Sequence, residues 1–399
     1  MTSWLGNVRR GVWDEASYLA NYHLRPRLPR LVCTVEAAQQ RLLGRAPLRI
    51  LEGRGTEGHQ TLAASFREPR LGRLFERRFA GKDAVVREQR PFDHTKQTAG
   101  SDIEAHEVPA FERTAWARRG FFGLPLWVRQ VVPLERGVDP FPPSRHIRHR
   151  IRMIQRCGYG YEVTRDRAAF SEFYDRMYSP TMLARHGADA FVRGRRYLER
   201  GLRHGALLVV TQGGRRVAGI LNVFHAVDPL HVSTWAGGLL DGDLDLLAED
   251  ADSACIYFSI QWALEKVGCR RISLSVTRPF LDDGLLRYRK RWGARLEPES
   301  AWAWNVVVLR VNRWTPAVRA TLCSNPFIVV GRDGLSGVAC WGGVAGGLDD
   351  LHAPGLSSLT IVTEHDQEPP PTASPDFVVT LTVGHEVEQL QALAHALAE

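Results

Sequence analysis

The sequence predicts an α/β (α+β) fold in which a mixed, largely antiparallel sheet is flanked by helices. One basis is three successive strand-like segments at residues 206–235, the first two joined by a Gly-Gly pair that is typical of hairpins. The other is a helix–strand–helix–strand order at residues 253–311. We expect an arm at 1–30, an N-terminal α/β lobe at 31–140, the main domain at 141–330 and a small Gly-rich C-terminal extension with a terminal helix at 331–399.

The composition bounds the class of protein. A chain of 399 residues with 44% hydrophobic and 24% charged residues can bury a sizeable core, which excludes an intrinsically disordered protein. The net charge of +8 suits phosphorylated substrates, CoA or RNA without choosing between them. The six cysteines form no C-x-x-C pair, which argues against a zinc site and a disulfide framework. Without a signal-peptide core or an apolar run of bilayer length, the chain is expected to be cytoplasmic, with no membrane span.

The stretch from Ser253 to Pro298 carries most of the functional signal. Its apolar residues first follow a helical stripe that ends at Gly268, and then alternate with Ser and Thr as in a strand. A loop containing proline leads to a short helix with four basic residues around Tyr288 and Trp292. A cationic helix that follows a strand and a capped loop suits an anionic ligand or a developing oxyanion.

The run from Gly284 to Gly293, GLLRYRKRWG, resembles the closing signature of FemAB-type acyltransferases of the Gcn5-related N-acyltransferase (GNAT) superfamily. Tyr288, Trp292 and Gly293 match the family pattern, whereas Arg289, followed by Lys290, stands where the family has lysine. Arginine keeps the positive charge but cannot shuttle a proton. The resemblance covers residues 144–310 and implies a GNAT-like lobe. It also implies transfer of an acyl or aminoacyl group to an amine or hydroxyl acceptor, in cell-envelope, polysaccharide or natural-product biosynthesis.

The same resemblance implies a set of candidate site residues. Candidates for the catalytic, cationic side are Tyr288, Arg289 and Lys290. Candidates for substrate binding are Tyr178, Arg185, Trp235, Gly237, Gly238, Asp282 and Asp283. For Tyr178 and Arg185, ordinary helix packing and surface charge are an equal interpretation. The two aspartates suit either the orientation of an amine or helix capping, and capping is the commoner use of aspartate at such a position.

The basic segment at residues 144–156, SRHIRHRIRMIQR, has helical spacing with isoleucines on its buried stripe. Arg148 and Arg152 on its other side are candidate phosphate-binding residues for a nucleotide, CoA or tRNA, and a solvated charged face is the alternative. Its two histidines lack a third ligand nearby, so no metal is expected. We expect no tightly bound cofactor, and acyl-CoA or aminoacyl-tRNA as the cosubstrate. The expected partners are a small-molecule acyl acceptor and a tRNA or carrier-protein donor.

Two other classes of function remain open. One is an RNA- or tRNA-binding protein without catalysis, which would use the basic segments at 145–156 and 287–291. The other is a nucleotide-cofactor enzyme of Rossmann type built on Gly53–Gly58, a G-x-G-x-x-G run after the strand-like Leu48–Glu52. It requires a parallel, doubly wound sheet in the first 140 residues. A glycine-rich strand-to-helix turn without a ligand is the favoured interpretation of this run, because such short motifs often match by chance. A helix is expected at Leu62–Phe79, apart from a break near Pro69.

Overall fold

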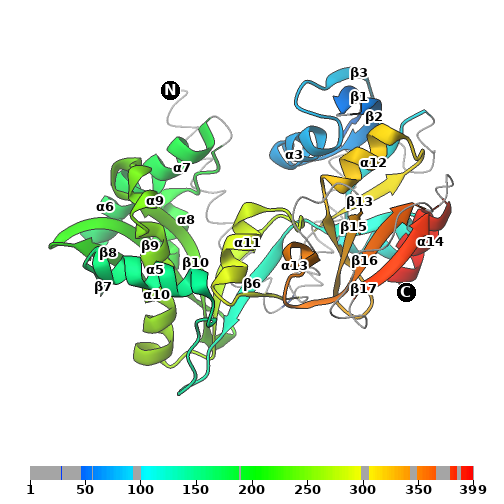
Figure 1. The fold of residues 1–399 in the computed structure, drawn as a ribbon. Helices are drawn as coiled ribbons and strands as arrows, with labels where there is room; N and C mark the ends of the chain where they lie inside the picture. The colour runs from blue at the N-terminus through cyan, green and yellow to red at the C-terminus, as the bar shows by residue number, and fades with distance from the viewer. Residues whose placement is uncertain are drawn as a thin grey trace, which may run out of the picture. The chain divides into compact units, whose positions relative to one another are not determined.

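The computed structural model describes residues 28, 46–55, 57–92, 100–187, 190–297, 305–341, 348–364, 378–383 and 388–398. The chain divides into two compact units, each assembled from separated segments, and Figure 1 labels many of the elements of both. Unit 1 comprises Met1–Pro29, Gln130–Ser275 and Arg289–Ala294, and unit 2 comprises Arg30–Arg129, Val276–Tyr288 and Arg295–Glu399. In the described part of the chain, no helix is long and apolar enough to cross a membrane.

Unit 1 is built on a mixed, largely antiparallel sheet with the strand order β6-β11-β10-β9-β8-β7. The strands are β6 (Val128–Pro133), β7 (Tyr159–Thr164), β8 (Gly205–Gln212), β9 (Arg215–His225), β10 (Asp228–Leu239) and β11 (Arg271–Thr277). Strands β7 to β10 pair antiparallel in sequence order, and β11 then joins β10 in parallel. The predicted arrangement of the core is therefore confirmed. The β8–β9 turn is the expected Gly213-Gly214 pair, and both glycines have positive φ.

Helices cover both faces of this sheet. Leu207, Leu221 and Val223 point to one face, where they pack against the helices before β8. Those helical segments are α6 (Arg167–Glu172), a π-helical segment (Phe173–Tyr178), α7 (Ser179–His186) and α8 (Arg195–Arg203). Asn222 points to the other face, where its amide donates to the Ser259 hydroxyl at 3.1 Å. Ser259 belongs to α10 (Ala251–Gln261), which packs on this face with α5 (Arg145–Arg156) beside it.

Unit 2 contains a six-stranded and a four-stranded sheet. The larger has the order β3-β1-β2-β4-β13-β5, formed by β1 (Leu48–Gly55), β2 (Gly58–Ser65), β3 (Val85–Arg90), β4 (Ile103–Val108), β5 (Phe122–Pro125) and β13 (Val306–Val311). The smaller is formed in order by β14 (Phe327–Val330), β15 (Leu335–Cys340), β16 (Leu356–Glu364) and β17 (Val378–Val383). One apolar core joins both sheets to α3 (Pro69–Phe79), α12 (Pro316–Cys323) and α14 (Glu388–Ala398).

The Gly53–Gly58 run is part of a β-hairpin. Strands β1 and β2 pair antiparallel through Gly55 and Gly58, so the glycines lead into a strand rather than a helix. Of the helix expected at Leu62–Phe79, residues 62–65 are strand, whereas Pro69–Phe79 is the helix α3. The chain needs glycine at position 53 because a Cβ there would lie 1.6 Å from the Ala80 carbonyl oxygen at the end of α3. In the described residues, the sheet around this hairpin is not a parallel, doubly wound one. The Rossmann-type alternative, which requires a parallel, doubly wound sheet in this region, is therefore wrong.

The domain boundaries also differ from the prediction. Residues 295–330, expected to complete the main domain, lie in unit 2 because β13 pairs with β4 and β5. Residues 331–399, expected to form a separate extension, belong to the same unit. Residues 140–143, at the expected boundary between the N-terminal lobe and the main domain, lie within unit 1 and have a packing role, since the Phe141 ring contacts Tyr257 and Trp292. Apart from residue 28, the predicted arm at 1–30 lies outside the described residues.

Candidate active site

The end of β10 is the most distinctive backbone feature of unit 1. Parallel pairing with β11 covers three residues, from His231 opposite Arg271 to Ser233 opposite Ser273. Within the described residues, β10 continues to Leu239 with no further pair to β11, and at its end the Thr181 hydroxyl bonds the N–H and the C=O of Leu239. Buried backbone N–H and C=O groups require partners, so an unpaired strand edge is a natural place for a ligand to bind.

A local distortion accompanies the end of the pairing on each strand. Ser275 in β11 has φ +72°, a left-handed conformation that is unusual for a residue other than glycine. Its N–H donates to the Ser273 hydroxyl at 3.2 Å, which holds the backbone in this conformation. On β10, the register with β9 shifts between Thr234 and Ala236, so Trp235 lies at a bulge. Such irregularities cluster where binding sites need backbone groups in fixed positions.

The two glycines after the bulge differ in their surroundings. Gly237 is exposed, and a Cβ there would make only ordinary contacts, at 3.7 Å or more. Gly238 is buried against the π-helical segment, where a Cβ would lie 2.4 Å from the Met177 carbonyl carbon and 2.5 Å from the Tyr178 nitrogen. Gly238 is therefore required for packing, whereas Gly237 leaves its backbone open to a ligand.

This contrast predicts a stability difference. Gly238→Ala should destabilise unit 1 by about 1–3 kcal/mol because the new methyl group overlaps backbone atoms. Gly237→Ala is the matched control and should change the free energy of unfolding much less. Urea unfolding of both variants measures the difference, and equal stability of the two would contradict the packing role of Gly238.

Tyr178, Trp235 and Arg185 all have structural contacts. The buried Tyr178 hydroxyl accepts from the Arg193 N–H at 2.9 Å, and burial raises its pKa. The Trp235 ring packs on Tyr197, with centroids 5.3 Å apart. Arg185 lies 3.9 Å from Asp252 in a half-exposed ion pair. These contacts describe how the residues are held, and their predicted role in substrate binding stays a prediction.

The start of α10 holds a charged group that the sequence reasoning missed. Asp250 precedes the helix, is buried and has φ +65°. Its carboxylate pairs with Arg150 of α5 and accepts from the Ser253 hydroxyl at 3.3 Å. Asp252 follows in the first turn, and burial raises the pKa of its carboxyl. The signal available in the sequence is the acidic run at 241–252, which has the composition of an ordinary loop.

The predicted cationic helix is α11 (Gly284–Arg291). The Asp283 carboxylate accepts from the Leu285 and Leu286 N–H groups at 2.9 and 3.0 Å, which is helix capping. Asp282 lies in unit 2, where it forms an ion pair with Arg78 at 2.9 Å.

The division between the units falls inside α11, between Tyr288 and Arg289. Tyr288, Arg289 and Lys290 are half-buried, and each makes contacts with other residues. Trp292 is fully buried against Phe141. Tyr288 thus belongs to unit 2, while Arg289 and Lys290 belong to unit 1. Their catalytic role stays a prediction.

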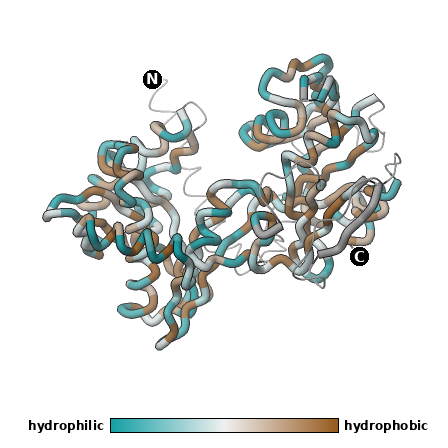
Figure 2. The backbone as a smooth tube through the Cα atoms, in the orientation of Figure 1, coloured by the Kyte–Doolittle hydropathy of each residue, from teal (hydrophilic) through white to brown (hydrophobic). Residues whose placement is uncertain are grey.

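Helix α5 has the predicted arrangement of one buried stripe and one basic face. Ile147 and Ile154 are buried, whereas Arg148 and Arg152 are exposed. No acidic residue occurs in the helix, and Figure 2 shows α5 as predominantly hydrophilic. Arg152 Nε donates to the Arg148 carbonyl at 3.3 Å, so the two side chains lie one turn apart on the same face.

Comparisons with known proteins give distant structural likeness only. No protein-family model and no curated protein matches the sequence. A putative lysylphosphatidylglycerol synthetase C-terminal domain from Agrobacterium fabrum is 12% identical, covering 67% of this chain and 82% of that one, with TM-score 0.35. L-PGS from Bacillus licheniformis is 14% identical, covering 66% of this chain and 85% of that one, with TM-score 0.35. A GCN5-related N-acetyltransferase from Sphaerobacter thermophilus is 12% identical, covering 52% of this chain and 58% of that one, with TM-score 0.31. With TM-scores this low, the functional argument rests on this chain's own residues.

Proposed function

We propose that this chain is a GNAT-type transferase that moves an acyl or aminoacyl group to an amine or hydroxyl acceptor. The observation that carries the proposal is the part of β10 after Ser233 that no longer pairs with β11, with its bulge at Trp235 and the exposed Gly237. A donor lying along this edge would place its acyl carbonyl against fixed backbone N–H groups. Preorganised N–H donors of this kind stabilise the negative charge that develops on a carbonyl oxygen under attack.

The proposed reaction needs alignment more than chemical groups from the protein. The acceptor's nitrogen or oxygen forms a bond to the donor carbonyl carbon, and the carbonyl oxygen takes the negative charge. The bond to the donor's leaving group then breaks, and the proton lost by the acceptor balances the charge on that group. Alignment of the two substrates and stabilisation of the oxyanion supply the rate enhancement. In this proposal Arg289 provides the cationic side of the site.

Of the two expected donors, we favour aminoacyl-tRNA over acyl-CoA. A helix N-terminus after a strand usually attracts phosphate because its N–H groups and dipole favour negative charge. The α10 N-terminus instead carries Asp250 and Asp252, and the Ser253 N–H donates to the Asp252 carboxylate at 2.8 Å. These carboxylates oppose a diphosphate at that position. The exposed arginines of α5 offer a separate surface for a phosphodiester backbone.

The donor assay separates these possibilities. The purified chain is incubated with tRNA charged with labelled amino acids, or with labelled acetyl-CoA, and a panel of amine and sugar acceptors. Mass spectrometry should detect acceptor-dependent transfer from aminoacyl-tRNA. Transfer from acetyl-CoA alone would overturn the choice of donor. Salt-dependent tRNA binding without any transfer would instead support the noncatalytic RNA-binding alternative.

The α5 surface gives a second prediction. Arg148→Gln/Arg152→Gln should weaken tRNA binding about tenfold and reduce the slope of log K against log salt by about 1–2, because two phosphate contacts are lost. The matched control is Arg196→Gln/Arg203→Gln, which removes two exposed charges from α8 on the opposite face of the sheet. Filter binding at several salt concentrations measures both. An equal loss in the two double variants would show that only net charge matters.

A further inference from the structure

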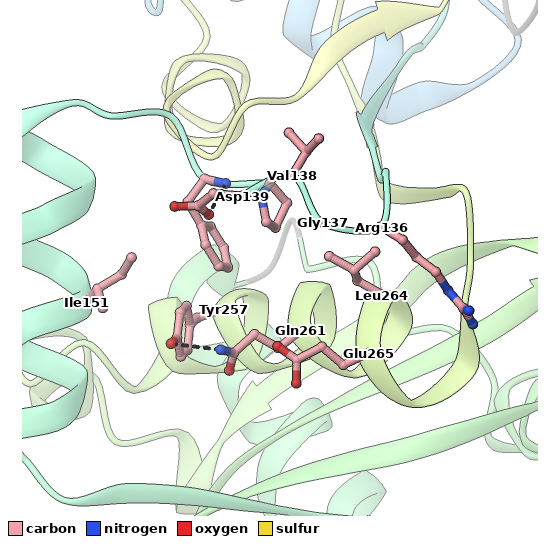
Figure 3. Close-up of a pocket in the computed structure, with 11 residues that line it drawn as sticks. Arg136, Gly137, Val138, Asp139, Ile151, Tyr257, Gln261, Leu264 and Glu265 are labelled. Carbon is pink, nitrogen blue, oxygen red and sulfur yellow. Dashed lines mark hydrogen bonds between the residues drawn. The ribbon is translucent and has the colours of Figure 1, made fainter.

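Unit 1 contains a pocket of about 680 Å³ on the outer side of α10, away from the sheet (Figure 3). It lies between the loop that precedes α5 and the last turns of α10, and α5 contributes Ile151. Its lining is Arg136, Gly137, Val138, Asp139, Pro140, Phe141, Ile151, Tyr257, Gln261, Leu264 and Glu265. This volume lies within the usual range for small-molecule sites. Because α10 separates the pocket from the sheet, the pocket is distinct from the β10 edge.

One wall of the pocket is aromatic and held in place. The Phe141 and Tyr257 rings are stacked with centroids 5.0 Å apart and an interplanar angle of 29°. The fully buried Trp292 contacts Phe141 edge-on at 5.9 Å and supports it from behind. The Tyr257 hydroxyl accepts from the Gln261 amide at 2.9 Å, which fixes the second ring. A rigid aromatic wall can receive the apolar part of a ligand at little cost in side-chain entropy.

The charged groups near this wall are carboxylates. Burial raises the pKa of Tyr257, and the negative charges of Glu265 and Asp139 raise it further, so both carboxylates act on the same hydroxyl. Asp139 is held in place because it accepts the Phe141 N–H at 2.9 Å. Figure 3 shows the Arg136 guanidinium at the opposite end of the pocket, directed away from both carboxylates. The aromatic end is therefore acidic in a protein whose net charge is +8.

The backbone of α10 changes at this point. The helix continues from Gln261 into a π-helical segment, Trp262–Val267, which ends at Gly268. Leu264 and Glu265 belong to this segment and both line the pocket. An inserted π turn shifts the following side chains around the helix axis, and such turns are frequent at functional sites. Here the segment contains both an apolar and an anionic lining residue.

We propose that this pocket binds a small organic cation, a primary ammonium carried on an aromatic or apolar stem. The stem would lie against Phe141 and Tyr257, and the negative charges of Asp139 and Glu265 would attract the ammonium. Carboxylates supply charge-assisted hydrogen bonds, and the aromatic faces add cation–π attraction. A neutral or anionic ligand of the same shape has no positive charge, so it gains neither the charge-assisted hydrogen bonds nor the cation–π attraction. This site lies outside the proposed transfer site and does not depend on the transfer reaction.

Benzylammonium chloride tests the proposal, with benzyl alcohol and benzoate as neutral and anionic comparisons. Saturation-transfer NMR on the full-length protein should show benzylammonium binding with a Kd of about 1 mM, as expected for so small a ligand. Benzyl alcohol and benzoate should bind at least about fivefold more weakly, since each lacks the ion pairs. Absence of benzylammonium binding, or equal binding of benzyl alcohol, would overturn the proposal.

Charge-neutralising variants locate the binding. Asp139→Asn/Glu265→Gln should weaken benzylammonium binding about tenfold, since the negative charges of two exposed carboxylates are lost. Asparagine keeps an oxygen that can accept the Phe141 N–H, so the loop conformation is retained. Glu135→Gln/Glu249→Gln is the matched control, because it removes two exposed carboxylates that do not line the pocket. A similar loss of affinity in the control double variant would mean that the cation responds to net charge rather than to this pocket.

Discussion

Replacing Arg289 with alanine is expected to lower the turnover of acyl transfer by roughly a hundredfold or more, with the fold intact. The expected loss corresponds to one preorganised oxyanion donor, which is worth about 2.7–4 kcal/mol in the transition state. The fold should survive because alanine keeps the backbone bonds that Arg289 makes at the end of α11. Its carbonyl accepts the N–H groups of Trp292 and Ala294 at 3.0 and 3.2 Å. Single-turnover kinetics with circular dichroism of the variant measure both effects.

Two companion variants show what the side chain contributes. Arg289→Lys should retain much of the activity if charge alone is needed, and little if the forked guanidinium geometry is needed. Lys290→Ala should have a much smaller effect than Arg289→Ala. The reverse result would assign the catalytic role to Lys290 instead of Arg289. If neither alanine variant changes turnover, the cationic helix has no catalytic role and the prediction fails.

Much of the unit 1 sheet was predictable because its signals are local. Alternating apolar residues indicate β8 to β10, and Gly213-Gly214 indicates the first hairpin. By contrast, which distant strand a given strand pairs with leaves no signal in the local sequence. The same alternation that predicted β13 could not show that Val306–Val311 pairs with Ile103–Val108. Similarly, residues 62–65 of β2 were predicted as the start of a helix, because the pairing with β1 that makes them a strand has no local signal in the sequence.

The candidate site shows the same limit at the level of single residues. Capping by Asp283 was among the expected uses, because a cap bonds to residues two and three positions later. The pairing of Asp282 with Arg78, 204 positions away in the sequence, has no local signal. The early end of the β10–β11 ladder is accompanied by a positive φ at Ser275, and the residue type serine gives no indication of a positive φ. Backbone geometry, rather than residue type, therefore defines the part of the site that sequence reasoning missed.

A buried charge network in unit 2 provides the largest expected effect on stability. Glu104 and Arg310 are both buried and form an ion pair at 2.7 Å. The Asn312 amide donates to the same carboxylate at 2.8 Å, and His106 Nε2 donates to it at 3.2 Å. Burial alone would raise the pKa of Glu104, but these hydrogen bonds and the Arg310 charge outweigh it and lower the pKa to about 2. Burial lowers the pKa of His106, which favours the neutral ring.

Glu104→Gln is expected to destabilise the protein by about 3–5 kcal/mol, because it leaves the buried Arg310 charge without its counterion. The matched control is Glu52→Gln, which breaks the more exposed pair with Arg87 and should cost about 1 kcal/mol or less. In the native protein, the stabilisation from Glu104 is complete above 4.5, the ordinary pKa of a glutamate in the unfolded chain, and is lost as the pH falls toward about 2. Urea unfolding of both variants between pH 7 and about pH 3 measures the size and the pH dependence. A Glu104→Gln protein with the same acid sensitivity as the native chain, or a loss no larger than that of Glu52→Gln, would contradict this role of the network.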